Sequence, residues 1–225
     1  VKFYKACRGA GIKPIGAADV WIGNPNAPDK PFRAMLIIRN DAGYLRLSEL
    51  LTEAYVGKDR NIHHAELNPE WLDNGDNSGL ICLSGAHYGE VGVNLLNGNE
   101  DAARAAALKY AAWFPDAFYL ELQRLPERPE WEACVSGSVK LAEDLGLPVV
   151  ATHPTQFMSR DDFNAHEARV CIAGGWVLTD KKRPRDFTPS QFFIPPETMA
   201  ERFADLPEAL ENTVEIAKRC NLHIT

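Results

Sequence analysis

Short, largely apolar runs alternate along the chain with longer segments in which apolar residues recur at helical spacing. The apolar runs are typical of buried strands, and they lie at residues 12–22, 34–38, 79–83, 118–122 and 147–152. The helical patterns lie at residues 1–8, 44–56, 100–114, 131–145, 161–172, 197–203 and 207–219. A buried strand followed by an amphipathic helix, several times over, predicts a parallel α/β architecture.

The pattern does not decide how such a sheet closes. An open doubly wound sheet and a barrel both place catalytic residues at strand ends. A nucleotide-binding open sheet often carries G-x-G-x-x-G after its first strand, and the sequence has neither this motif nor a Walker A loop. Both closures therefore stay open at this point.

Composition bounds the size of the core and the surface charge. The 225 residues are 45% hydrophobic, which is enough for one sizeable core or two small ones. The formal net charge of -7 disfavours a broad grip on duplex DNA, because an acidic surface repels phosphate. The obvious basic patch consists of Lys181, Lys182, Arg183 and Arg185. It is either a solvated loop or a contact to phosphate or a partner.

Cysteine usage and hydropathy indicate the cellular compartment. The five cysteines are odd in number and none is spaced C-x-x-C, which predicts reduced, mostly buried thiols in a cytoplasmic protein. No apolar run approaches the ~18 residues of a membrane span, so we expect no membrane association. The chain opens at Val1 inside a helical pattern without an N-cap. We therefore expect it to begin within an element of a longer protein.

Polar residues that could carry chemistry follow the predicted strands. The carboxylates and imidazoles among them form a possible metal set: Asp19, His87, Glu90, Glu121 and His153. None has a local ligand spacing such as H-E-x-x-H. For each there is a structural alternative: an arginine partner for Glu121, a polar loop and helix start for His87 and Glu90, and a packed turn for His153. The pair His166-Glu167 similarly indicates helix packing beside a solvated acid.

Several strings, taken in order, resemble one family. Residues 6–19 are similar to the A-x-x-x-G-I-K-P-I-x-G-x-E/D stretch of the PHP domain in bacterial DNA polymerase III alpha subunits. Further matches follow in the family's order, at residues 40–44, 79–85, 119–124, 147–152, 165–169 and 209–217. The resemblance spans essentially the whole chain, and the ordered set is specific although each string alone is weak.

The resemblance implies a distorted seven-stranded β/α barrel of the PHP type. Its first strands, including an H-x-H ligand strand, would lie upstream of Val1. By the same resemblance residues 1–180 form the barrel and residues 181–225 a helical extension toward the polymerase body. Intact members of the family hold a metal cluster at the rim and hydrolyse phosphate esters, because several cations polarise the phosphoryl group and activate a water.

The sequence departs from the family's ligand pattern. Asp19 occupies the family's Glu/Asp position and His153 is a displaced candidate, so these two are the residues that could still bind metal. At the other vestigial positions the family's ligands are replaced by Arg33, Ala86, Pro154 and Gln156. A multinuclear site needs many ligands at once. We therefore expect no catalytic residue and no cofactor in this segment, and Zn, Mn or Fe only if the site is active.

The implied role is that of a module in a replicative DNA polymerase, a nucleotidyltransferase whose own catalytic aspartates lie outside this chain and use Mg. The module would be structural and would dock the proofreading exonuclease (epsilon) subunit, with DNA bound by other domains of the polymerase III alpha chain. The alternative is an active metal-dependent phosphoesterase, either a 3'-5' exonuclease or a pyrophosphatase. A stand-alone phosphatase is a third interpretation, which the polymerase-like tail at residues 205–220 disfavours.

Overall fold

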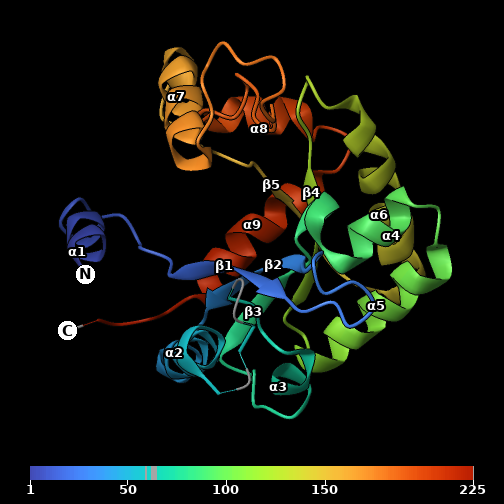
Figure 1. The fold of residues 1–225 in the computed structure, drawn as a ribbon. Coiled ribbons are helices and arrows are strands. Elements are labelled where there is room, and N and C mark those ends of the chain that lie inside the picture. The colour runs from blue at the N-terminus through green and yellow to red at the C-terminus, as the bar shows by residue number, and fades with distance from the viewer. Residues whose placement is uncertain (59, 62–64, 225) are drawn as a thin grey trace.

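A computed structural model describes residues 1–58, 60–61 and 65–224. They form a five-stranded sheet in sequence order, with strands β1 (Ala17–Ile22), β2 (Phe32–Ile38), β3 (Leu80–Leu83), β4 (Phe118–Gln123) and β5 (Val149–Thr152) (Figure 1). Each predicted strand is present. The first begins at Ala17 rather than at Ile12, because the segment before it contains Pro14, which cannot donate to a ladder.

The directions of the strands correct the parallel prediction. β2 runs antiparallel to β1 and β3, whereas β3, β4 and β5 are parallel. The loop 23–31 is too short for a helical crossover, and a short loop joins antiparallel strands. The carboxyl ends of β1, β3, β4 and β5 therefore share one rim with the amino end of β2. In the described residues the sheet stays open at β1 and β5, so the closed seven-stranded barrel is not seen here.

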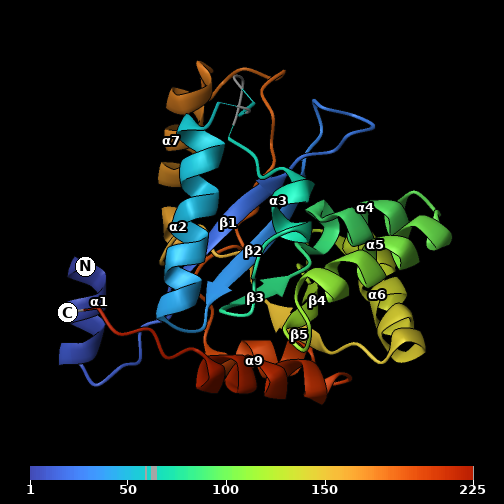
Figure 2. The same cartoon turned by 90° about the horizontal axis from the view of Figure 1, so that it is seen from below.

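Helices cover the sheet on several sides. They are α1 (Lys2–Gly9), α2 (Asp41–Val56), α3 (Pro69–Asp73), α4 (Glu90–Leu96), α5 (Glu100–Trp113), α6 (Glu132–Leu145), α7 (Phe163–Gly174), α8 (Pro196–Arg202) and α9 (Pro207–Arg219). Figure 2 shows α4, α5 and α6 together on one side, α2 on the other, and α9 beside β5. All the predicted helices are present. Three helices start at asparagine N-caps, whose side chains accept a backbone N–H of the first turn: Asn40, Asn68 and Asn99.

Alternation along the strands separates an apolar face from a polar one. Every residue of β4 is buried. Phe118, Leu120 and Leu122 point to one face, and Tyr119, Glu121 and Gln123 to the other, because successive side chains alternate across a strand. The apolar face packs against α6, and it joins the main core with the large side chains of the neighbouring strands. Glu121 and Gln123, on the polar face, lie near the carboxyl end of β4 at the rim, where the side chains could carry chemistry.

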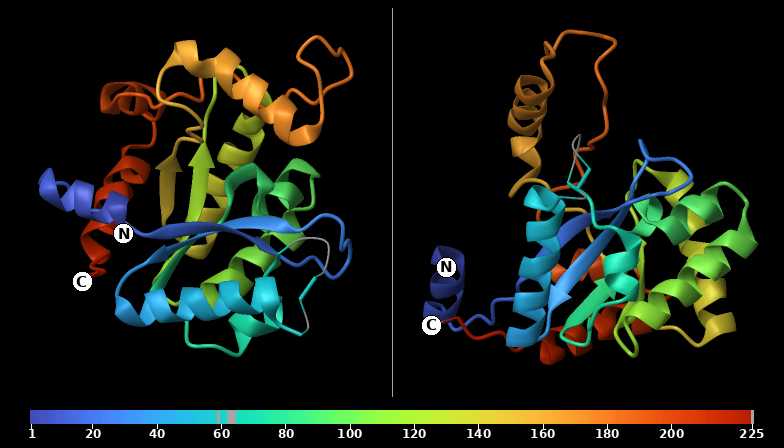
Figure 3. Two further views of the ribbon diagram at one scale, coloured as in Figure 1. Left: turned by 60° about the vertical axis from the view of Figure 1, so that its left-hand side comes forward. Right: turned by 60° about the horizontal axis from the view of Figure 1, so that its bottom comes forward.

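The tail of the chain packs on the same core. α9 lies against β5, and Asn212 of α9 donates from Nδ2 to the Val149 carbonyl at 2.8 Å. Phe203 is fully buried and Ile216 is nearly so, both within the main core cluster. Phe203 and α9 therefore share a core with the sheet, and the boundary at residue 180 stays a prediction. Figure 3 shows α7 and the loop after it beyond the carboxyl ends of β4 and β5.

The cysteines and the helices bear on the expectations drawn from composition. All five cysteines are free thiols, and four of them are buried. Burial raises the pKa of the Cys134 thiol to about 11, which keeps it protonated and unreactive at neutral pH. Within the described ranges, no helix combines the length and the apolar character that a membrane crossing needs.

Candidate functional site

A cavity of about 530 Å³ opens at the rim. Its walls come from the polar faces of β1, β2 and β4, from the segment after β5, and from the loop at residues 186–191. Most of the predicted vestigial positions meet there: Asp19, Arg33, His153, Pro154 and Gln156. Ala86 does not line the cavity. It is buried at the start of a short 3₁₀ helix with φ of 49°, and it is the next residue, His87, that reaches the cavity.

Asp19 and Arg33 form an ion pair across the β1–β2 hairpin. Arg33 donates to one Asp19 carboxylate oxygen, Oδ1, from Nε at 2.9 Å and from Nη2 at 2.7 Å. The register explains the contact: Trp21 lies opposite Arg33 and Asp19 opposite Met35, so the two charges are diagonal neighbours on one face. A guanidinium is always cationic and cannot ligate a metal. The carboxylate best suited to a metal is therefore neutralised by a fixed cation.

His153 uses both of its ring nitrogens in protein contacts. Nε2 lies 2.9 Å from the Phe192 carbonyl oxygen, and Nδ1 lies 3.2 Å from Nη1 of Arg202. Since the guanidinium can only donate, Nδ1 is the acceptor and Nε2 carries the hydrogen, which fixes one neutral tautomer. Burial, opposed by the carbonyl contact and reinforced by Arg202, lowers the pKa of His153. Neither nitrogen is free to bind a metal ion in this arrangement.

Glu121 lies deep in the cavity wall, with only 1% of its surface exposed. Its Oε1 accepts from the Thr152 hydroxyl at 2.5 Å and from Gln123 Nε2 at 3.0 Å. Gln123 Nε2 also donates to the Thr152 hydroxyl at 3.0 Å, so the three side chains form a small network. Among the described residues these are the partners of the Glu121 side chain, and an arginine partner, the structural alternative given above, is not among them.

His87 packs between aromatic rings at the edge of the same cavity. Its imidazole stacks on Trp131 with ring centroids 3.6 Å apart, and the Tyr88 ring is tilted at 4.1 Å. Burial, together with the positive charges of Arg33 and Arg128, lowers the pKa of His87 to about 4. The imidazole is therefore neutral at pH 7, and neither of its nitrogens has a hydrogen-bond partner within the described part of the chain.

The side chains at the rim do not fit a catalytic metal cluster. Across residues 1–58, 60–61 and 65–224, no group of three or more His, Cys, Asp or Glu side chains is placed to hold a metal ion. Asp19 is neutralised by Arg33, and both nitrogens of His153 are engaged. Glu90 lies outside the rim cavity, where it begins α4 and pairs with Lys109 at 2.7 Å. Four residues of the possible metal set therefore line one cavity and Glu90 does not, but within the described residues the four are not placed as a ligand group.

Comparison with known proteins places the chain in a family. The family model described as "PHP domain" matches residues 1–125. The chain belongs to the PHP domain family. Over 225 residues it is 96% identical to the DNA polymerase III subunit alpha of Neisseria meningitidis serogroup A and 46% identical to that of Pseudomonas fluorescens. It is 44% identical over 224 residues to the DNA polymerase III subunit alpha of Escherichia coli strain K12.

Each of these matches covers 100% of the chain. It covers only 20% of the Neisseria protein and 19% of each of the other two, so the chain spans about a fifth of the length of these relatives. The predicted resemblance to the PHP domain of bacterial DNA polymerase III alpha subunits is therefore confirmed along the whole chain.

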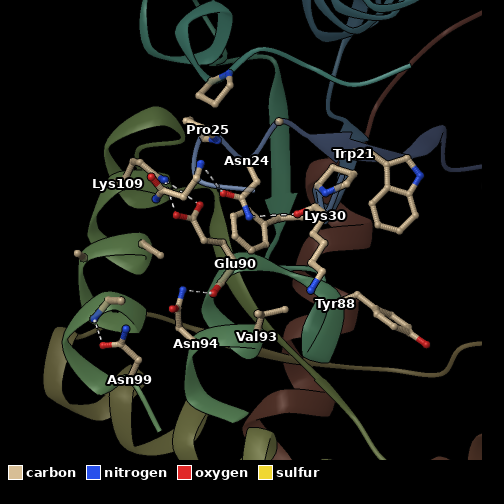
Figure 4. Close-up of a pocket in the computed structure, with 18 residues that line it drawn as sticks. Trp21, Asn24, Pro25, Lys30, Tyr88, Glu90, Val93, Asn94, Asn99 and Lys109 are labelled. Atoms are coloured by element: carbon tan, nitrogen blue, oxygen red, sulfur yellow. Dashed lines mark hydrogen bonds and ion pairs between the residues drawn. The ribbon is translucent and has the colours of Figure 1, made fainter. Parts of the chain in front are cut away.

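A second cavity, of about 720 Å³, lies outside the rim of the PHP domain. Figure 4 shows it between the loop after β1 and the helices α4 and α5, with Asn24 and Lys30 on the loop side and Glu90 and Lys109 on the helix side. Lys109 donates to both Glu90 carboxylate oxygens at 2.7 Å, so the charges on that wall neutralise each other. Trp21 and Tyr88 line both cavities, and the other residues that line the rim cavity do not line this one.

The basic stretch after α7 is only partly a surface feature. Arg183 is buried and pairs with Glu167 of α7 at 2.5 Å, which corrects the prediction of a solvated acid at Glu167 and takes Arg183 out of the solvated-loop alternative. His166 packs edge-on against Phe187 with centroids 4.6 Å apart, as the helix-packing prediction requires. Phe187 and Asp186 line the rim cavity, and no local motif could have assigned them to it, because they reach it through these long-range contacts.

Proposed function

We propose that this PHP domain is a structural and docking module of a replicative DNA polymerase III alpha subunit, with a degenerate metal site. The proposal is supported by the relatives, which carry that name and match the chain from one end to the other. The main support for a degenerate metal site is the ion pair between Arg33 and Asp19. A metal cluster would need the Asp19 carboxylate as a free ligand, and Arg33 is already its counter-ion. The engaged His153 ring adds to it.

The proposed role in replication is supported by the names of the relatives. The relatives are DNA polymerase subunits by name, so we propose that DNA synthesis and its Mg ions belong to other parts of a longer polypeptide. The acidic charge of this chain, formally -7, favours DNA binding through those other parts. The proposed partner is the proofreading exonuclease (epsilon) subunit, and the proposed compartment is the cytoplasm.

The finer architecture is also a proposal. β1 and β5 are the two edges of the sheet, and exposed edges are commonly covered or paired in natural proteins. We propose that two further strands, outside the described residues, join these edges into the seven-stranded barrel of the family. Residues 181–225 would then lead from the barrel toward the polymerase body while α9 anchors them to β5.

Docking is tested with a paired glycine substitution in the full-length protein. Gly43 of α2 packs directly on the Gly79 carbonyl, so a Cβ in Gly43→Ala would clash with backbone. Overpacking of this kind costs roughly 1–3 kcal/mol or more. The control is Gly9→Ala, since a Cβ there meets no atom within 4 Å. We expect the first variant to lose co-elution with the exonuclease subunit while keeping primer extension, and the control to keep both.

Metal content separates the proposal from its alternative. We expect elemental analysis of the full-length protein to find less than one equivalent of Zn, Mn or Fe bound to this domain. An active phosphoesterase would carry two or more equivalents and cleave phosphate esters in a way that chelators abolish. If both were observed and both were lost in Asp19→Ala, the degenerate-site proposal would be wrong. Unchanged exonuclease binding by Gly43→Ala, with the domain shown to be disrupted by limited proteolysis, would refute docking.

A further inference from the structure

Three buried side chains in the rim cavity carry polar atoms without hydrogen-bond partners among the described residues. They are Oε2 of Glu121, Oε1 of Gln123 and both ring nitrogens of His87. The residues are 1%, 3% and 8% exposed respectively, and all three line the cavity. Buried polar groups are nearly always satisfied, because leaving one unpaired costs about 1–3 kcal/mol. Two of these atoms, the carboxylate oxygen and the amide oxygen, can only accept hydrogen bonds. A ligand that pairs with them must therefore supply a hydrogen-bond donor.

The charged side chains on the cavity walls indicate the charge of the ligand that carries this donor. Asp19, Glu121 and Asp186 line the cavity with carboxylates, while Arg33 is the one cationic side chain among the residues that line it. The two histidines on its walls have lowered pKa values and are neutral at pH 7. Asp19 is neutralised by Arg33, so Glu121 and Asp186 are the lining carboxylates without an ion pair among the described residues. A cation is favoured there, and a phosphate or another anion is disfavoured.

The size and the lining favour an organic cation over a metal ion. The volume of about 530 Å³ falls within the range of small-molecule sites, roughly 300–1,000 Å³. Trp21, Tyr88 and Trp131 contribute ring surface to the walls, and ring faces attract ammonium groups. A divalent metal would require more ligands of its own kind than the described side chains bring together.

We propose that the rim cavity binds a small organic amine, whose ammonium group donates to Glu121 Oε2 and Gln123 Oε1 while its carbon chain lies against the aromatic walls. The network around Glu121 prepares this arrangement. Thr152 and Gln123 Nε2 hold the carboxylate through Oε1, which leaves Oε2 and the Gln123 oxygen as the acceptors without a partner in the described residues. The site adds a binding activity to the domain and does not depend on exonuclease docking.

Calorimetry with three four-carbon probes tests the proposal in the intact protein. The probes are 1,4-diaminobutane, 1,4-butanediol and butanedioate, which keep the length of the molecule and change only its charge. At physiological salt, which screens non-specific surface attraction, we expect the diamine to bind at least about tenfold more tightly than the diol or the dianion. Equal binding of the three probes, or preference for butanedioate, would overturn the proposal without the need of any variant.

Matched substitutions then locate the site. Glu121→Gln keeps the size of the side chain and an acceptor for Thr152 but removes the charge, so we expect diamine affinity to fall about tenfold or more. Glu90→Gln makes the same change in the other cavity and should leave the affinity within about twofold. Unchanged affinity in Glu121→Gln refutes the assignment. The assignment is also refuted if MgCl₂ binds, competes with the diamine and loses its binding in Glu121→Gln. In that case the ligand of these oxygens would be a metal ion.

Discussion

The buried ion pair between Glu167 and Arg183 gives the sharpest stability prediction for this domain. The two side chains are only 6% and 7% exposed, and their charged groups lie 2.5 Å apart. Arg183 also donates from Nε to the Leu178 carbonyl at 3.2 Å, so it ties the loop after α7 to the helix. Arg183→Ala would leave the Glu167 carboxylate buried without its counter-ion, and removing one partner of a buried pair costs about 3–5 kcal/mol.

Hydrogen exchange in the intact protein measures this cost where it arises. We expect backbone amides in residues 163–175 to exchange more than about 100-fold faster in Arg183→Ala, since 1.4 kcal/mol corresponds to a factor of about 10 in the opening equilibrium. Arg185→Ala is the matched control, because Arg185 is exposed in the same loop. An acceleration below about fivefold would show that water reaches the Glu167 carboxylate and that the pair is not buried in solution.

A double substitution distinguishes the pair's contribution from the loss of packing. Glu167→Met with Arg183→Met replaces both charges by apolar groups of similar length, and such replacements are often neutral or stabilising. We therefore expect exchange in residues 163–175 to return to within about tenfold of the wild-type rate. Continued fast exchange in the double variant would mean that Arg183 acts through its hydrogen bond to the Leu178 carbonyl rather than through its charge.

Two further predictions concern pH and the tail. The pKa of His87 is about 4 in the folded protein against an ordinary histidine value of 6.5, so the unfolded chain binds the proton first as pH falls. The contribution of His87 to the free energy of unfolding is fully present above pH 6.5 and decreases as the pH falls, by about 3 kcal/mol at pH 4. The midpoint of urea unfolding should therefore depend less on pH in this range in His87→Phe than in the wild type. Phe203→Ala should lower the free energy of unfolding by about 3–5 kcal/mol, because Phe203 is fully buried. Val214→Ala, on the exposed side of α9, is the control and should lower it by less than about 0.5 kcal/mol. A small effect of Phe203→Ala would instead indicate that residues 181–225 fold as a separate unit.

Periodicity predicted β3 and β4 most directly, because each is a short run that is buried at every residue, whereas β1 is an edge strand that alternates between exposed and buried positions. It missed α3 and gave α4 only as a helix start at Glu90, because their five and seven residues are too short to show a helical repeat. It also assigned β2 the wrong direction, since the side-chain pattern of a buried strand is the same in both directions. The length of the loop 23–31 was the available signal, because a parallel neighbour needs a longer crossover.

The sequence predicted which residues lie at the site, but it did not predict the interactions that those residues make. The family motif placed Asp19, Arg33 and His153 at the rim, and the structure brings the three together in one cavity. The ion pair of Asp19 depends on the hairpin register, which no local pattern specifies. His153 meets a carbonyl and a guanidinium 39 and 49 residues further along the chain, and these contacts exist only after α8 has packed. Such partners decide whether a ligand position is free, and they are set by tertiary structure.

Glu121→Leu tests why an unpartnered carboxylate oxygen persists in this wall. If stability alone governed the position, an apolar residue of similar size would serve it better, because it removes the cost of burying the group. Gln123 and Thr152 would remain hydrogen-bonded to each other at 3.0 Å. We therefore expect Glu121→Leu to keep the free energy of unfolding within about 1 kcal/mol of wild type, or to raise it, while abolishing diamine binding. A loss above about 2 kcal/mol would instead make Glu121 a structural anchor of the β4–β5 pair, and the carboxylate would need no ligand to explain it.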